Sequence, residues 1–190
     1  MPSSKEDTPI TWDIQFCNLP NVLRYCKKCG KKSEYICSRE FRVNAQQKML
    51  DIWLIYKCAH CNTTWNSTIY SRVSPQNLGA TFLEQFHSND KNLATQYAMD
   101  ISLLQRNGVE IKMPDFQVVG ENVSLEKAAR IKIKNQYVLP LKVSSILRTK
   151  LGISQREYDA LLINGQIQSE AGQDLKKYKL SSSEIIIKIS

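Results

Sequence analysis

The chain has 190 residues, a formal net charge of +8 and 42% hydrophobic residues. This length accommodates one domain of ordinary size or two small ones, and the hydrophobic content is sufficient for a packed core. Its first eight residues are mostly polar or charged, and no segment approaches the roughly 18 uncharged apolar residues of a membrane helix. We therefore expect a cytoplasmic protein with no membrane partner, where reducing conditions favour metal-bound cysteines over disulfides.

Four of the six cysteines lie in two C-x-x-C motifs, called the hooks below. Four thiolates in two such turns are the ligands of a closed, tetrahedral zinc site. Structural Zn²⁺ is therefore the expected cofactor. Its predicted ligands are Cys26, Cys29, Cys58 and Cys61.

The residues around the hooks support a zinc ribbon. Gly30 and Asn62 follow the hooks directly. The turn of a zinc knuckle favours a residue with positive φ at this position, and glycine and asparagine tolerate that conformation. The 28 residues between Cys29 and Cys58 exceed the compact pattern of about 15 to 20 residues and predict an intervening hairpin. A redox dithiol is the alternative, but such a motif opens a helix in a thioredoxin-like pattern, and neither hook does.

The N-terminal segment, residues 1–73, is expected to be this β-rich zinc ribbon. Runs of apolar, aromatic and β-branched residues predict strands at 35–37, 41–43, 50–57 and 64–73. Cys17 and Cys37 lie outside the hooks and are expected to be small buried apolar side chains, with Cys37 as a spare ligand candidate.

Residues 74–108 carry helical signals. Ser74-Pro75 predicts a helix start, and apolar residues recur every four positions as far as Phe86. A second helix is predicted from Asp90 to Arg106, so that the two form a helical hairpin with an apolar core face. Residues 109–129 are irregular and are interpreted as a linker, or a strand pair, leading into a second domain.

The C-terminal segment, residues 130–190, predicts a small α+β domain. Alternation at 130–134 indicates a strand, and Tyr137–Leu139 continues or pairs with it. Two helices are expected next, one ending at Gly152 and one opened by the capping box Ser154-Gln155-Arg156-Glu157. Short strands are then predicted at 166–168, 178–180 and 184–189.

This segment resembles the S4-type RNA-binding fold over roughly its last 50 residues. The resemblance rests on Lys142-Val143-Ser144-Ser145-Ile146-Leu147, Leu151-Gly152-Ile153-Ser154, Glu157, Leu161-Leu162 and Gly165-x-Ile167. It implies two helices that present basic side chains to structured RNA. Together with the ribbon and the hairpin, it makes the expected fold class α+β.

The basic positions implied by the resemblance are only partly present. Lys142 stands where the family often has arginine, whereas four uncharged residues occupy other basic positions of the family: Gln155, Ala160, Ile163 and Gln166. Arg148, Lys150 and Arg156 offer a substitute patch. With Lys142, they are the predicted nucleic-acid contacts.

The order of ribbon, helices and S4-like tail is similar to an uncharacterised family of small bacterial zinc-ribbon proteins. That resemblance implies no activity. The positive charge lies in two blocks, with a net +6 in residues 21–57 and +6 in 130–190, so RNA is the first expected partner. A protein partner of a scaffold is the alternative.

An enzyme is not expected. The sequence has no Gly-rich phosphate loop, nucleophile elbow or H-E-x-x-H motif, and a four-cysteine zinc site offers no open coordination position. No small-molecule substrate is predicted.

Overall fold

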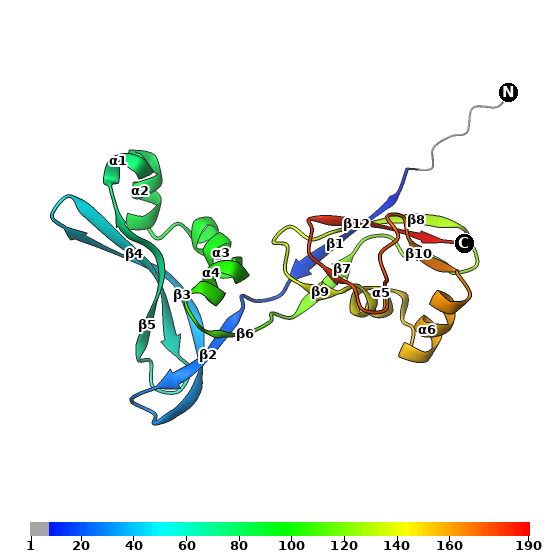
Figure 1. Ribbon diagram of the computed structural model, residues 1–190, viewed down its shortest axis with the longest axis horizontal. Helices are drawn as coiled ribbons and strands as arrows, with labels where there is room; N and C mark the ends of the chain where they lie inside the picture. The colour runs from blue at the N-terminus through cyan, green and yellow to red at the C-terminus, as the bar shows by residue number, and fades with distance from the viewer. Residues whose placement is uncertain (1–7) are drawn as a thin grey trace. The chain divides into compact units, whose positions relative to one another are not determined.

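The computed structural model describes residues 8–190, which fall into two compact units (Figure 1). Unit 1 combines residues 8–16 with Phe116–Ser190, and unit 2 is Cys17–Asp115. Each unit has a five-stranded sheet and its own helices, which confirms the α+β class. Within residues 8–190, no helix combines the length and the apolar character needed to cross a membrane.

Unit 2 is built on an antiparallel sheet with the order β5-β4-β3-β2-β6. The predicted long strands are confirmed as β4 (Met49–Cys58) and β5 (Thr64–Val73). The two short runs expected before them belong to one strand, β3 (Lys31–Gln46), which continues through an irregularity between Cys37 and Phe41. Beyond β3, the sheet continues with β2 (Asn21–Cys26) and ends at the edge strand β6 (Glu110–Lys112).

Four helices occupy the region where two were expected. They are α1 (Pro75–Leu78), α2 (Ala80–His87), α3 (Lys91–Met99) and α4 (Ile101–Arg106). Gly79 interrupts the first predicted helix with a φ of +77°. Asp100 interrupts the second, because its carboxylate accepts a hydrogen bond from the Leu103 amide at 2.8 Å and caps α4.

These helices belong to the core of unit 2 and do not form a separate hairpin domain. Phe86 and Leu93 pack with Ile52 of β4, while Ala94 and Ala98 belong to the cluster that contains Leu54 and Tyr56. The apolar stripes of short helices need such a partner, because helices of this length are marginal alone.

The sheet of unit 1 has the order β10-β12-β8-β1-β7 and includes the N-terminal strand. β1 (Ile10–Phe16) pairs parallel with β8 (Ala129–Lys134) and antiparallel with β7 (Phe116–Val119). Residues 10–16 were expected in the ribbon, and 116–119 in the linker, so both boundaries differ from the prediction. Residues 1–7 of the expected ribbon lie outside the described residues.

The physical reason is the alternation within β1. Trp12 and Ile14 point to the core of unit 1 and are 0% and 5% exposed. They extend the apolar face formed by Ile131 and Ile133 of β8, which are fully buried. Strand partners chosen by such faces need not be neighbours in the sequence.

The segment after β7 closes tightly over β1. The Trp12 indole Nε1 donates to the Glu121 carbonyl at 2.8 Å. Gly120 has a φ of +144°, and a Cβ there would lie 2.5 Å from the Thr11 carbonyl oxygen. Only glycine fits this close approach of two backbones.

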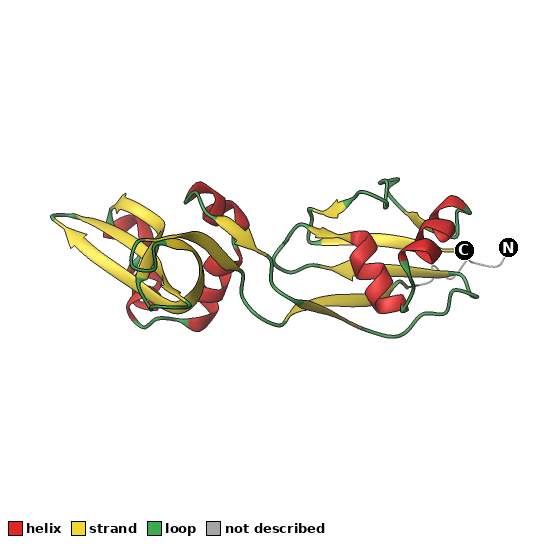
Figure 2. Cartoon of the chain, turned by 90° about the horizontal axis from the view of Figure 1, so that it is seen from below, coloured by secondary structure: helices red, strands yellow, loops and turns green. Residues whose placement is uncertain are grey.

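The remaining elements of unit 1 follow the predicted order. α5 (Val143–Leu151) lies across the strands in Figure 2, and α6 (Gln155–Ile163) begins with the predicted capping box. The predicted short strands are confirmed as β10 (Ile167–Ser169), β11 (Lys179–Leu180) and β12 (Glu184–Ile189). Tyr137–Leu139 is not a strand, whereas β9 (Leu141–Lys142) pairs with β11.

Candidate functional site

The two hooks meet at one end of the sheet of unit 2. Cys26 is the last residue of β2 and Cys58 the last of β4, and each following turn brings a second cysteine back. All four sulfur atoms lie within 4.8 Å of one another. The Cys26–Cys61 and Cys29–Cys58 sulfur distances are 3.5 and 3.9 Å.

This spacing fits a four-coordinate metal ion. Sulfur ligands at about 2.3 Å from a tetrahedral ion lie about 3.8 Å apart. Cys26, Cys29, Cys58 and Cys61 could therefore hold a metal with little movement, and the predicted ligand set is brought together as one cluster.

Both turns have the same backbone geometry. The Gly30 amide donates to the Cys26 carbonyl and the Asn62 amide to the Cys58 carbonyl, each at 2.9 Å. Gly30 and Asn62 have φ values of +66° and +57°. The expected positive φ behind each hook is thus confirmed, and the residues that tolerate it are the ones present.

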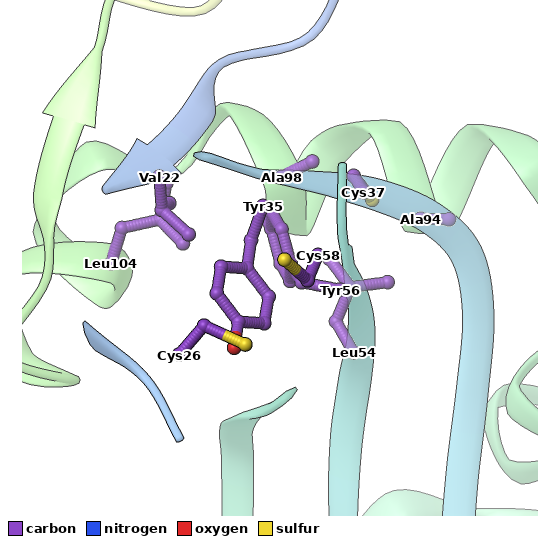
Figure 3. Packing of buried hydrophobic residues seen from close by; sticks show 10 residues of the cluster. All are labelled: Val22, Cys26, Tyr35, Cys37, Leu54, Tyr56, Cys58, Ala94, Ala98 and Leu104. Atoms are coloured by element: carbon purple, nitrogen blue, oxygen red, sulfur yellow. The ribbon is translucent and has the colours of Figure 1, made fainter. Parts of the chain in front are cut away.

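Tyr35 of β3 contributes a hydrogen bond to the cluster. Its hydroxyl lies against the Cys26 sulfur in Figure 3, and this bond is the largest cause that lowers the pKa of Cys26 from 9.0 to about 6. The pKa of Cys29 is raised to about 12, chiefly because its thiol donates to Cys61. Without a cation, some thiols therefore keep their protons, whereas a bound metal favours four thiolates.

We expect Tyr35→Phe to weaken metal binding and move it to higher pH. The lowered pKa of Cys26 stabilises the thiolate of the folded, metal-free chain. This contribution is full above about pH 9 and is lost as the pH falls to about 6. Removal of the hydroxyl should reduce metal affinity about 10-fold, as measured by chelator competition between pH 6 and 8. Tyr25→Phe, at an exposed tyrosine of β2, is the control, and equal pH profiles for the wild type and Tyr35→Phe would contradict this role.

The two other cysteines are not part of the cluster. Cys37 is buried as expected, and burial raises the pKa of its thiol. Cys17 is exposed, so the prediction that it is buried is wrong. It follows β1 at the point where the chain leaves the core of unit 1, and its amide donates to the Asp115 carbonyl.

The four predicted nucleic-acid contacts are spread over β9, α5 and α6. Lys142 precedes α5, whereas Arg148 and Lys150 lie in its last turn, roughly 9 to 12 Å along the axis. Arg148 donates to the Gln155 side chain at 2.9 Å. Arg156 is exposed on the first turn of α6.

Lys150 is engaged inside unit 1. Its ammonium donates to the Gly120 carbonyl at 2.7 Å and to the Asn122 side chain at 3.0 Å. It also lies 5.9 Å from the centre of the Trp12 ring. These contacts give Lys150 a role in holding the segment after β7 over β1.

The structure places another lysine beside Lys142. Lys179 lies directly opposite Lys142 in the β9–β11 pair, and both side chains are exposed. Lys176 and Lys177 are exposed shortly before β11. We call these four residues the lysine patch. The basic run Lys176-Lys177-Tyr178-Lys179 is apparent in the sequence. Its approach to Lys142 is not, because it depends on the pairing of β9 with β11.

Three basic side chains on β8 and β12 of unit 1 are paired with acids. Arg130 and Lys188 contact the Glu170 carboxylate at 3.0 and 3.2 Å, and Lys132 contacts Glu184 at 3.4 Å. The hydrogen bonds from Arg130 and Lys188 lower the pKa of Glu170. Part of the +6 block is therefore neutralised locally.

Comparison with known proteins places the chain in a family. The family model described as "Protein of unknown function (DUF1062)" matches residues 43–173, more than half of the chain. The match includes the second hook but begins after the first, and it covers parts of both units. No curated protein and no solved structure matches. The chain belongs to the DUF1062 family.

Proposed function

We propose that the protein is a zinc-stabilised RNA-binding protein without catalytic activity. The metal centre would be a structural zinc ribbon in unit 2, because four thiolates match the ligand preference of Zn²⁺ and close its coordination sphere. Lys27, Lys28 and Lys31 around the first hook are exposed and add positive charge near this end.

RNA binding would lie in unit 1, as an S4-like module. The helix pair α5–α6 followed by short strands supports this reading. The observation that carries the proposal is the direct juxtaposition of Lys142 and Lys179. Like charges facing each other across a strand pair are destabilising, and a phosphate backbone between them relieves that repulsion and releases counterions.

Removal of this pair tests the proposal. In the full chain, Lys142→Gln/Lys179→Gln should weaken binding to a structured RNA and reduce the slope of log K against log salt by about 1.4 to 1.8. Lys91→Gln/Lys127→Gln removes the same charge at exposed positions elsewhere and should leave most of the affinity. Electrophoretic mobility shifts between 50 and 300 mM salt, roughly the range where such contacts weaken, measure both. No shift of the wild type at the lowest salt concentration would refute RNA binding.

A protein-interaction scaffold is the second candidate, and α6 favours it. Ile163 is 83% exposed, and Ala160 is exposed one turn earlier, at positions where the S4 resemblance implies basic residues. On this proposal, the two side chains belong to an apolar surface that a protein partner covers. Purification with and without nuclease separates the candidates, because a stoichiometric partner that resists nuclease supports the scaffold.

A further inference from the structure

An arginine lies partly buried in the core of unit 2 with donors that have no partner. The Nε and Nη1 atoms of Arg24 are buried, and no acceptor within residues 8–190 receives a hydrogen bond from them. Burial of a guanidinium without a counter-charge is costly. Hydrogen bonds within the described residues therefore do not offset the cost of burying these two nitrogen atoms.

Arg24 shares a face of β2 with the first cysteine of the cluster, two residues before it. Alternation along β2 puts Val22, Arg24 and Cys26 on one face, the face that enters the core. The guanidinium carbon lies 4.7 Å from the centre of the Trp65 ring and 5.7 Å from that of Tyr35. Tyr35 in turn donates its hydroxyl to the Cys26 sulfur.

Tyr35 links the guanidinium to the cysteine cluster. Its ring contacts Arg24, and its hydroxyl contacts the Cys26 sulfur. Together with Trp65, this ring holds the cation at this end of the core.

We propose that Arg24 is the buried counter-ion of the metal–thiolate centre. The inference rests on the proposed zinc site. A divalent ion with four thiolates carries a formal charge of −2, and a guanidinium beside it reduces this charge where water screens least. Lys27, Lys28 and Lys31 around the first hook are exposed, so solvent and salt screen their interaction with the centre. Arg24 is therefore a positioning residue, which supports the thiolates without binding the metal.

Two substitutions separate charge from packing. Arg24→Met keeps an apolar stem against Trp65 and removes the charge, whereas Arg24→Lys keeps the charge and removes the planar group. We expect the Arg24→Met variant to bind zinc about 10-fold more weakly or worse, and the Arg24→Lys variant to retain most of the affinity. The full chain is titrated with zinc against a chromophoric chelator, after circular dichroism at saturating zinc has shown that each variant folds.

Arg42→Met is the matched control, because Arg42 is exposed on β3 of the same sheet. It should leave zinc affinity unchanged. Equal affinity of the wild type and Arg24→Met, or a greater loss with Lys than with Met, would overturn the counter-ion role and leave the metal site standing. A wild-type chain that binds no zinc would overturn the metal site itself, and with it this inference.

Discussion

Cys58→Ser is expected to remove the metal from unit 2 and to unfold that unit. Cys58 is fully buried at the end of β4, and its sulfur lies 3.9 Å from that of Cys29. A structural zinc ion contributes about 10 to 16 kcal/mol to the folding of a small site, which equals or exceeds the stability of a typical domain, about 5 to 15 kcal/mol. Metal content by mass spectrometry and unfolding by calorimetry measure the two effects.

Unit 1 should remain folded in this variant, because it has its own sheet and core. One of two thermal transitions is therefore expected to disappear while the other persists. Cys17→Ser is the control, since Cys17 is exposed and outside the cluster. Retention of one equivalent of zinc by Cys58→Ser, with an unchanged transition, would remove the basis for a four-cysteine centre.

Trp12→Ala is expected to destabilise unit 1 by about 3 to 5 kcal/mol and to leave zinc binding unchanged. The indole is 0% exposed, donates to the Glu121 carbonyl and lies below the Lys150 ammonium. Its loss leaves a cavity in the core of unit 1 and removes the hydrogen bond that holds the segment after β7. Urea unfolding followed by amide NMR signals of residues 129–134 measures the change.

The matched control is Trp53→Ala, at a partly exposed tryptophan of β4 in unit 2. This substitution should lower the stability of unit 2 and leave the stability of unit 1 unchanged. If Trp12→Ala weakened zinc binding and spared the signals of unit 1, the assignment of β1 to the C-terminal sheet would be wrong.

Local patterns in the sequence predicted the elements better than their partners. β4, β5, α5 and α6 were expected near their observed bounds, because periodicity and caps are encoded within each segment. The parallel pairing of Ile10–Asp13 with Ile131–Lys134 was not expected. Alternation shows that a strand has an apolar face, but not which distant strand shares it.

The candidate site shows the same limit. The four cysteines were predicted because their spacing carries the information, and the structure brings them together. Tyr35 and Arg24 were missed because their positions depend on the register of β2 and β3, in which Val22 pairs with Tyr35 and Arg24 with Ser33. The lysine patch was missed for the same reason, since Lys142 and Lys179 meet only through β9 and β11.

The pairing of β1 with β7 determines how the chain is organised along its length. These strands are antiparallel neighbours, with Phe16 opposite Phe116, and all of unit 2 lies between them in the sequence. Asn18 and Asp115 join the two ends of unit 2, with the Asp115 amide donating to the Asn18 side chain at 3.0 Å. Unit 2 is thus an insertion within a hairpin of its host. During synthesis, the strands that pair with β1 follow the inserted unit in the chain. The inserted unit is therefore able to fold before β1 joins its sheet.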